Sequence, residues 1–523
     1  DGDATAPAAA EPVRGGQVVV GITSDVGGVN PLIVPPSTIT TEISRRLFLP
    51  LVGERPDYSV APRLAESWEF SDDRLALTLH LRDDVVWSDG TPVTSADVVF
   101  TYQAWTDPDV AWEGASSLEA VAGVDALDAH TVRFRFHHVY SAQLLDVASG
   151  GVILPAHAWS RLPFAEWRGN ADWFRQNLVV DGPFTLASWR PQQELVLERN
   201  PRYYEPGLPR LDRVVFRVIP DQSSQLTQLL GGDVDFAIQL GPEQAATVEE
   251  HPDTRVISYW SRGYIGIGWN VRREPFAESD VRRALTLGID RQTLVDSIWG
   301  PHARVVSSLV LPDTPGHDPD DQPLPYDPDQ ARRLLEQHGW VDRDGDGIRE
   351  KAGQRLVLRL ITNAGNRQRE DALVLIQEQL RRVGVAVESE VPEFNAFLEQ
   401  VYGGDFDGVL GGWVVPTTFD FRYALHSSEI GGNNVIGFAD PRVDRLLEQV
   451  RSQPTLEAAR PLLVELQAVL RREQPYTFLW QSQRLHGVSE RLHGLEPSHL
   501  FTFDDLRHWW VEPEAGRAAP AGG

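Results

Sequence analysis

The sequence predicts an α/β protein with two α/β lobes and an additional β-rich region, and three observations carry this prediction. The chain has 523 residues, which is more than one domain usually holds. Strand-like and helix-like segments alternate in residues 211–240 and again in the second half, which indicates helices layered on a largely parallel sheet. Residues 64–136 instead hold short strand-like runs separated by polar turns, which is typical of a sheet-rich region.

The first half contains a strand, two hairpins and a capped helix. Residues 15–25 hold a β-branched run bounded by glycines, which predicts a buried strand. Residues 67–81 and 121–136 each predict a pair of strands joined by a polar turn. Thr94 is expected to cap a helix whose third position is Asp97.

The second half alternates helices and strands. Residues 281–299 and 370–384 have helical periodicity, whereas residues 356–362, 385–391 and 406–413 are strand-like runs. One apolar face of the second helix is predicted to pack on a sheet. That face consists of Leu373, Ile376, Leu380 and Val383.

Composition and motifs argue against several classes of function. The net charge of −27 opposes nucleic-acid partners and docking on anionic lipid. The absence of cysteine excludes disulfides, thiol nucleophiles and cysteine-ligated zinc. The sequence has no G-x-S-x-G, H-E-x-x-H or phosphate-binding glycine motif, and His137 and His138 lack helical metal-ligand spacing. We therefore expect a protein that is not an enzyme.

The start of the chain is rich in Ala, Pro and Gly, which predicts the flexible tail of an exported protein whose signal peptide has been removed. The alternative is a cytosolic protein that begins further upstream. No run approaches the roughly 18 apolar residues that a membrane-spanning helix needs, so we expect no transmembrane segment.

Residues 64–105, "LAESWEFSDD" through "TSADVVFTYQAW", resemble the signature of the family 5 extracellular solute-binding proteins. These are the oligopeptide-, dipeptide- and nickel-binding receptors of ABC importers. Further segments keep the family order, and together with the signature they span residues 16–511. They read "GPFTLASWRPQQELVLERNPRYY", "LLGGDVDFA", "DVRRALTLGIDRQTLV", "GGNNVIGFADPRVDRLLEQ" and "REQPYTFLW".

The resemblance implies a periplasmic-binding-protein-like fold, with two α/β lobes joined by a hinge and a β-rich domain inserted in the first lobe. The chain is expected to cross between the lobes near residues 269–271 and 478–481. The expected order is a flexible tail (1–15), first-lobe segments (16–50, 175–270 and 480–511), the β-rich domain (51–174), the second lobe (271–479) and a second flexible tail (512–523).

The resemblance also implies a function, namely an extracytoplasmic receptor, periplasmic or on the cell surface, that captures a peptide or peptide-like solute by hinge closure and delivers it to ABC permease subunits. We expect a monomer, and lipid anchoring through a residue upstream of this chain is left open. An oligosaccharide or another small organic solute is the alternative ligand, and an enzyme on a binding-protein fold is the remote alternative.

The ligand site is expected beside the segment "GGWVVPTTFDFRYALHSSEIGGNN". Peptide receptors of the family commonly hold the ligand's amino group with an Asp three residues after the Trp, where this chain has Pro416. Relative to another branch of the family, Asp420 keeps its spacing from Trp413 but Thr418 replaces an Asp. Either Asp420 takes over the role or the ligand lacks an amino group. The expected contacts are Trp413, Pro416, Thr417, Thr418, Asp420, Asn434, Ser24, Asn30, Tyr264 and Trp269.

The segment "VDRDGDGIRE" raises the question of a metal. Asp342, Asp344 and Asp346 alternate as in a calcium loop, but the twelfth position, where an EF-hand has a bidentate Glu, is Gly353. A solvated acidic turn between a helix and a strand is favoured, and no other cofactor is expected. The candidate calcium ligands are Asp342, Asp344, Asp346, Ile348 and Glu350.

Overall fold

Two units, each with its own part of a mixed sheet, make up the computed structural model of the protein. The structure describes residues 11–35, 37–496 and 498–512. Unit 1 comprises the described residues up to His138, those from Gln143 to Tyr259 and those from Arg484 onward, and unit 2 comprises residues 139–142 and 260–483. Most of the two expected tails lies outside the described residues, and their described parts, residues 11–15 and 512, are neither helix nor strand.

The sheet of unit 1 has the strand order β11–β1–β10–β9–β8 and continues from β11 into the end of β20. β1 runs parallel to β10 and β11, whereas β8, β9 and β10 are antiparallel neighbours. β1 matches the first predicted strand. The strands are β1 (Gln17–Ile22), β8 (Phe184–Arg190), β9 (Glu194–Arg199), β10 (Arg213–Val218) and β11 (Phe236–Ala237).

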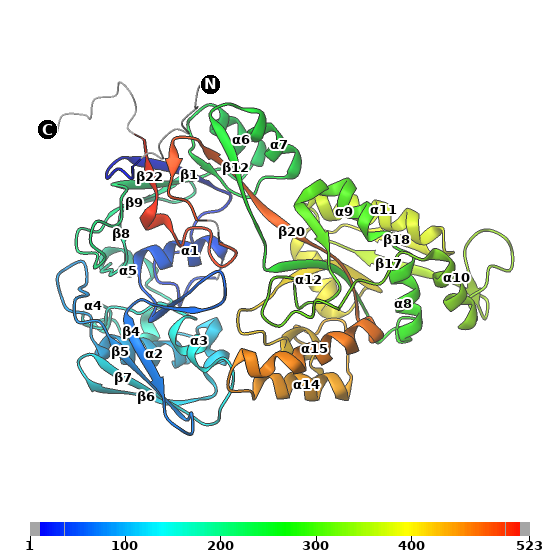
Figure 1. Ribbon diagram of the computed structural model, residues 1–523, viewed down its shortest axis with the longest axis horizontal. Coiled ribbons are helices and arrows are strands. Elements are labelled where there is room, and N and C mark those ends of the chain that lie inside the picture. Colours follow the sequence, from blue (N-terminus) through cyan, green and yellow to red (C-terminus); the bar gives the residue numbers. More distant parts are fainter. Residues whose placement is uncertain (1–10, 36, 497, 513–523) are drawn as a thin grey trace, which may run out of the picture. The chain divides into compact units, whose positions relative to one another are not determined.

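A separate four-stranded antiparallel sheet, in the order β4–β5–β7–β6, forms the β-rich part of unit 1 (Figure 1). Both predicted strand pairs are confirmed as β4–β5 and β6–β7. α2 (Ser95–Thr106) packs against β6 and β7, and the Asp97 carboxylate accepts a 2.9 Å hydrogen bond from the Thr94 N–H, as the capping prediction expects. The strands are β4 (Ala65–Phe70), β5 (Ala76–Leu81), β6 (Val121–Asp128) and β7 (Thr131–Phe136).

The remaining elements of unit 1 connect and cover these sheets. Gly231 follows the last residue of α6, and Gly232 has a φ of +78°, a left-handed conformation that suits glycine at a helix end. The helices are α1 (Thr38–Leu47), α3 (Gln143–Ala148), α4 (Ala156–Trp159), α5 (Ala171–Gln176), α6 (Gln222–Leu230) and α7 (Pro242–Glu250). The short strands are β2 (Val52–Glu54), β3 (Val60–Pro62), β21 (Leu492–His493) and β22 (Trp510–Val511). β12 (Thr254–Trp260) ends at the first residue of unit 2.

The sheet of unit 2 has the order β18–β17–β19–β13–β20, and β14 also pairs with β20. β17 is parallel to β18 and β19, but β13 is antiparallel to β19 and β20. The prediction of a largely parallel sheet is therefore wrong in both units. In unit 1 a short turn joins the antiparallel pair β8 and β9, whereas in unit 2 β13 pairs antiparallel with β19 and β20, which lie far along the chain from it. The strands are β13 (Gly263–Trp269), β14 (Ala303–Val305), β17 (Val357–Ile361), β18 (Ala386–Glu390), β19 (Gly408–Val414) and β20 (Tyr476–Ser489), with the hairpin β15 (Glu350–Lys351) and β16 (Gln354–Arg355) beside them in sequence.

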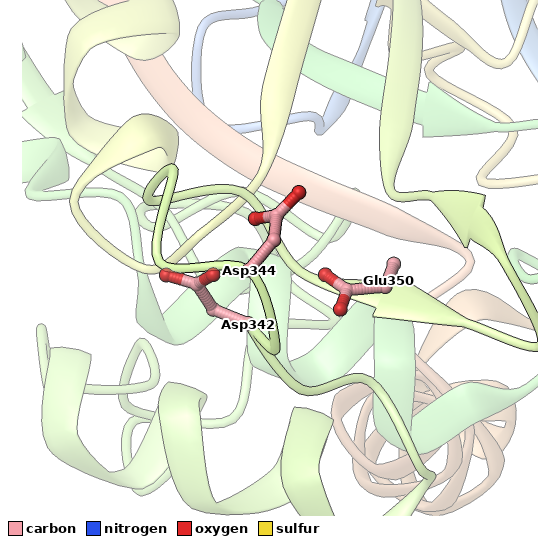
Figure 2. A group of neighbouring side chains, drawn as sticks. All are labelled: Asp342, Asp344 and Glu350. Atoms are coloured by element: carbon pink, nitrogen blue, oxygen red, sulfur yellow. The ribbon is translucent and has the colours of Figure 1, made fainter.

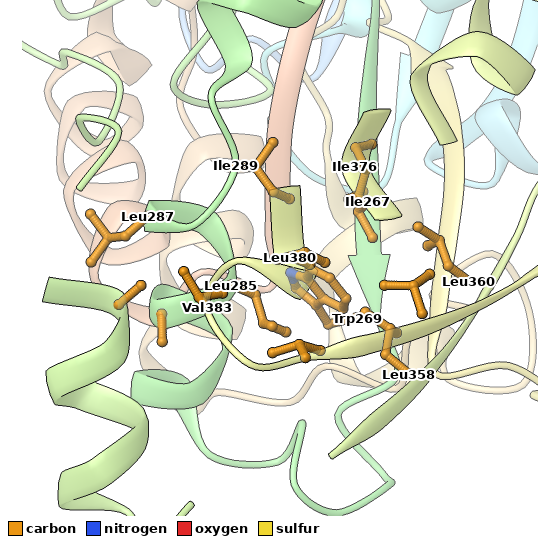
Figure 3. Close-up of a cluster of buried hydrophobic side chains, with 14 of the residues drawn as sticks. Ile267, Trp269, Leu285, Leu287, Ile289, Leu358, Leu360, Ile376, Leu380 and Val383 are labelled. Atoms are coloured by element: carbon orange, nitrogen blue, oxygen red, sulfur yellow. The ribbon is translucent and has the colours of Figure 1, made fainter. Parts of the chain in front are cut away.

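One face of this sheet is covered by a hydrophobic core (Figure 3). Ile267 and Trp269 of β13 meet Leu285 of α8 and the buried face of α11 there. The apolar face predicted for α11 is confirmed, since Leu373, Ile376, Leu380 and Val383 are all buried in this core. The helices of unit 2 are α8 (Ser279–Leu287), α9 (Arg291–Ile298), α10 (Pro328–Gln337), α11 (Arg367–Arg381), α12 (Phe394–Gly403), α13 (Arg422–Leu425), α14 (Pro441–Arg451) and α15 (Leu456–Glu473).

The helix predicted over residues 281–299 is two helices, α8 and α9. Gly288 ends the first, and the Asp290 carboxylate accepts a 3.1 Å hydrogen bond from the Thr293 N–H to start the second.

Apart from the short segment 139–142, which belongs to unit 2, the chain passes from one unit to the other at residues 259/260 and 483/484. The resemblance predicts two crossings between the lobes. The first, residues 269–271, begins at the last residue of β13, and the second, residues 478–481, lies within β20. Because a hinge is defined by motion, its position and the domain boundaries stay predictions.

Candidate ligand-binding site

The floor of a cavity in unit 2 is formed by paired residues of β13 and β19. In the antiparallel register, Tyr264 lies opposite Trp413, Gly266 opposite Gly411 and Gly268 opposite Val409. Successive side chains point to opposite faces of a strand, so these pairs share the face away from the Ile267 core. Glycines in the middle of both strands therefore leave room above the sheet.

The apolar face of α12 forms the opposite wall. Its residues recur with helical spacing, so they line one side of the helix. The cavity has a volume of about 250 Å³. The α12 residues that line it are Phe394, Phe397, Leu398, Val401 and Tyr402. Val435 and Tyr476 complete the apolar lining.

The neighbouring glycines of β19 have different roles. A Cβ on Gly412 would lie 2.1 Å from the Tyr264 carbonyl oxygen, so only glycine fits between these strands. A Cβ on Gly411 would meet nothing closer than the Arg369 Nη1 atom at 3.9 Å. Gly412 thus allows the strands to approach, whereas Gly411 leaves cavity space open.

Two polar side chains, Asn363 and Arg369, line the cavity at the carboxyl end of β17 and the start of α11. The Arg369 Nη2 atom donates a 2.5 Å hydrogen bond to the Asn363 Oδ1 atom. Its Nε atom is buried without a hydrogen-bond partner among the described residues. Burial lowers the pKa of the Arg369 guanidinium, which is the cost of holding a charge in apolar surroundings.

Aromatic side chains complete the end of the cavity beside Trp413. The Tyr423 ring contacts the Trp413 ring edge-on, with centroids 5.2 Å apart. The Tyr264 hydroxyl is buried without a hydrogen-bond partner in the described structure, and burial raises its pKa well above the usual value. This end therefore presents ring surfaces together with an unused hydroxyl donor.

Of the predicted 413–420 segment, Trp413 lines the cavity and the residues that follow form a turn. The Phe419 N–H donates a 3.1 Å hydrogen bond to the Pro416 carbonyl oxygen, and Phe419 has a φ of +53°. Thr417 and Thr418 are half-buried in this turn. None of the three predicted residues between Trp413 and Phe419 is among the cavity-lining residues.

Asp420 is already paired with cations of its own unit. Its carboxylate lies 2.9 Å from the Arg422 Nη2 atom and 3.6 Å from the Arg451 Nη1 atom. It also accepts a 3.1 Å hydrogen bond from the Arg422 N–H. An amino group would have to compete with both arginines for this carboxylate.

The structure places two further predicted residues in structural roles. Asn434 is fully buried, and its amide donates to the carbonyl oxygens of His426 and Phe438 at 3.0 and 2.8 Å. Trp269 is buried in the core on the other face of the sheet, where its Nε1 atom donates to Thr477 at 3.0 Å. Tyr264, in contrast, lines the cavity.

Ser24 and Asn30 belong to unit 1 and follow β1. The Asn30 side chain is buried and accepts a 3.0 Å hydrogen bond from the Leu32 N–H, and Ser24 is exposed. Residues 31–35 next to them line a second cavity of about 200 Å³, together with residues 111–113 and Arg168. A ligand contact for any of the ten predicted residues stays a prediction.

Three of the candidate calcium ligands lie close together, on a loop and at the start of β15 (Figure 2). Carboxylate oxygens of Asp342, Asp344 and Glu350 lie within 4.8 Å of one another. The Asp342 carboxylate accepts hydrogen bonds from the Gly345 and Gly347 N–H groups at 2.8 and 3.0 Å.

The other two candidates differ. The Asp346 carboxylate pairs with Arg355 at 2.7 Å, and the Ile348 N–H donates to it at 2.8 Å. The helix before the loop, α10, begins after Asp327, whose carboxylate accepts a 2.8 Å hydrogen bond from the Gln330 N–H. These bonds are those of a self-supporting acidic turn, and calcium binding stays a prediction.

The chain is similar to known proteins along nearly its whole length. The model of the bacterial extracellular solute-binding proteins, family 5, matches residues 59–433. The oligopeptide-binding protein AppA of Bacillus subtilis is 30% identical over 511 residues, which cover 96% of this chain and 93% of that protein. The glutathione-binding protein GsiB of Escherichia coli is 26% identical over 503 residues, 94% of each chain.

Solved structures agree with these matches. The structure of Bacillus subtilis AppA in complex with a nonapeptide superposes with a TM-score of 0.80 at 29% identity, covering 96% of this chain and 100% of that one. A periplasmic-binding-protein-like fold, the predicted class, is thereby confirmed.

The cavity was missed by the sequence-based site prediction, apart from Trp413 and Tyr264. No sequence motif marks the lining residues Asn363, Arg369 and those of α12. The alternating glycines of "GYIGIGW" and "GVLGGW" are the signal that could have located it, because glycine within a strand marks close approach of another group.

Proposed function

This chain belongs to family 5 of the bacterial extracellular solute-binding proteins, and we propose that it captures a peptide or peptide-like solute for an ABC importer. The observation that carries the proposal is the 30% identity, over 96% of the chain, to an oligopeptide-binding protein. The solved structure of that protein holds a nonapeptide. The aromatic and glycine-floored cavity of unit 2 supports the proposal, since such concave apolar sites bind organic solutes.

The family is one of binding receptors rather than enzymes. The proposed function therefore contains no bond making or breaking. Among the side chains that line the cavity there is no histidine, serine, cysteine or carboxylate to serve as nucleophile or base.

The proposal places the receptor outside the cytoplasm, as a monomer that delivers its solute to permease subunits in the membrane. Family members are extracellular proteins, and no helix among the described residues is long and apolar enough to cross a membrane. Hinge closure and a lipid anchor upstream of this chain are further parts of the proposal.

A second candidate ligand is a non-peptide organic solute. The structure of AgaA, a protein of the same fold, contains agropinic acid. It matches this chain with a TM-score of 0.75 and 22% sequence identity. The fold thus holds non-peptide solutes in that relative.

Native mass spectrometry of the purified protein tests the proposal. We expect a retained ligand whose fragmentation spectrum is that of a peptide. A retained sugar or other organic mass would replace the peptide with the second candidate. Conversion of the retained compound with time, rather than stable occupancy, would contradict a pure binding role.

A further inference from the structure

The cavity of unit 2 has a mostly apolar lining and one cationic side chain among its lining residues, Arg369. We propose that it recognises a carboxylate next to a bulky apolar group, with the apolar group on the glycine floor and the carboxylate on Arg369. The inference rests on the proposed receptor function and narrows its ligand class.

Arg369 has unused hydrogen-bonding capacity. Its guanidinium makes one side-chain hydrogen bond, to Asn363, and its Nε atom has no partner within the described residues. No salt bridge is recorded for it in that part of the chain, and the nearby Glu370 carboxylate accepts instead from the Gly365 N–H at 2.9 Å. An unpaired, partly buried charge is costly unless a counter-ion arrives.

Other buried arginines of unit 2 differ in this respect. Arg282 donates to the carbonyl oxygens of Phe276, Ala277, Glu473 and Gln474. Arg291 likewise donates to the carbonyl oxygens of Phe478 and Leu324. Both are satisfied by the backbone and neither lines the cavity. Arg369 is the guanidinium that the fold leaves open to a ligand.

The charge of the cavity selects an anion over an ammonium group. No acidic side chain is among the lining residues of the cavity. Asp420, which follows the lining residue Trp413 in the sequence, is paired with two arginines. A ligand ammonium would meet repulsion from Arg369, and the Glu370 carboxylate beside Arg369 is not among the lining residues. A carboxylate fits the fork of a guanidinium with two parallel hydrogen bonds.

The size of the cavity selects the apolar part. Its volume of about 250 Å³ is below the roughly 300–1,000 Å³ of sites that enclose a whole small ligand. It therefore suits one large side chain of a longer solute. Phe394 and Tyr402 at its edge are 51% and 55% exposed, which leaves ring surface for such a group to cover.

Two libraries of random N-acetylated hexapeptides test the inference, one with free C-terminal carboxylates and one with C-terminal amides. Each is mixed with the protein after its retained ligand has been removed, and complexes are read by native mass spectrometry. We expect at least tenfold more retention of free acids than of amides that lack Asp and Glu. The retained peptides should carry a bulky apolar residue beside the carboxylate.

The variant Arg369→Gln should bring this ratio close to one. Arg367→Gln is the matched control, because Arg367 lies on the same helix turn, is 74% exposed as a side chain and pairs with Asp371. The control should keep the tenfold ratio. Melting temperatures of all three proteins verify folding.

A second variant tests the apolar part independently. Gly411→Val adds atoms into open cavity space, so the fold is retained while the preference for bulky apolar residues should fall at least tenfold. Unchanged preference in this variant would overturn the assignment of the glycine floor.

The remaining outcomes separate the inference from the receptor role. Retention of amides that carry Asp or Glu beside an apolar residue, lost in Arg369→Gln, supports the inference with a side-chain carboxylate as the source. Equal retention of peptides without any carboxylate overturns it and leaves the receptor role intact. Retention of no peptide from either library overturns the inference, and the peptide part of the proposed function is then decided by the mass of the solute that the purified protein retains.

Discussion

Two side chains of opposite charge, Arg369 and Asp420, come after the neighbouring parallel strands β17 and β19 of unit 2, and their surroundings differ. Arg369 follows β17 and faces the cavity with an unsatisfied guanidinium, whereas Asp420 follows β19 and is paired with Arg422 and Arg451. Both positions come after the carboxyl ends of strands, where ligands bind in α/β sheets. The difference shows that a charge at such an edge is available to a ligand only when the protein leaves it unpaired.

The largest expected effect is on stability, at the glycines of β19 that form the floor of the cavity. Gly412→Ala should lower the free energy of unfolding by about 3 kcal/mol, because its Cβ would lie 2.1 Å from a backbone oxygen. Gly411→Ala, the matched control, should change it by less than about 0.5 kcal/mol. Urea unfolding followed by tryptophan fluorescence measures both. Equal stability of the two variants would contradict the description of the floor.

A further carboxylate, Asp505, extends the comparison, because none of the described arginines lies within salt-bridge distance of it. Asp505 of unit 1 is buried and accepts a hydrogen bond from the Glu496 N–H, and burial raises its pKa to about 7. The folded state then holds a proton that the unfolded state releases near pH 4, so stability falls as pH rises from about 4 to 7. Between pH 4.5 and 7.5, Asp505→Asn should remove about 3 kcal/mol of this fall, since the pKa is raised by about three units, each unit corresponds to about 1.4 kcal/mol, and part of the fall lies below pH 4.5.

Urea midpoints at pH 4.5 and 7.5 for the wild type and Asp505→Asn check this prediction. The variant should gain on the wild type as pH rises. A constant difference between the two proteins across this range would show that the carboxyl group does not titrate there.

On the loop side, Asp420→Asn should have a small effect. Partly exposed ion pairs contribute about 0–1 kcal/mol, so stability should fall by less than about 1 kcal/mol. Affinity for a retained peptide should change less than about twofold by calorimetry, for the free-amine and the N-acetylated form alike. A tenfold loss confined to the free-amine form would instead make Asp420 the amino-group anchor.

The smallest effect is expected at the acidic turn. Titration with calcium should give no heat and no rise in melting temperature, because backbone N–H groups occupy the Asp342 carboxylate and Arg355 pairs with Asp346. A measurable heat that disappears in Asp344→Asn would establish a calcium site.

Much of the fold could be predicted from local patterns. The cap of α2, the strand pairs of the β-rich region and the buried face of α11 depend on neighbouring residues in sequence, and the sequence predicts each of them. The division of helix 281–299 at Gly288 and the mixed strand directions depend on turn geometry and long-range pairing, and these were missed.

The site was harder to predict for the same reason. Trp413 and Tyr264 stand in recognisable segments, but the burial of Arg369 arises only when α12 and β19 pack around it. Arg422 lies beside Asp420 in the sequence, but the second partner, Arg451, lies far along the chain, so this second pairing leaves no mark in the local sequence. Its spacing from Trp413 in the family pattern made Asp420 a candidate, and that spacing does not show whether the carboxylate is paired.

A crystal structure of the protein with its retained solute tests the central claim most directly. We predict a peptide whose apolar group contacts Gly411 and Trp413 and whose carboxylate lies within hydrogen-bonding distance of the Arg369 guanidinium. A solute that leaves this cavity empty and makes no contact with residues 411–420 would contradict the account.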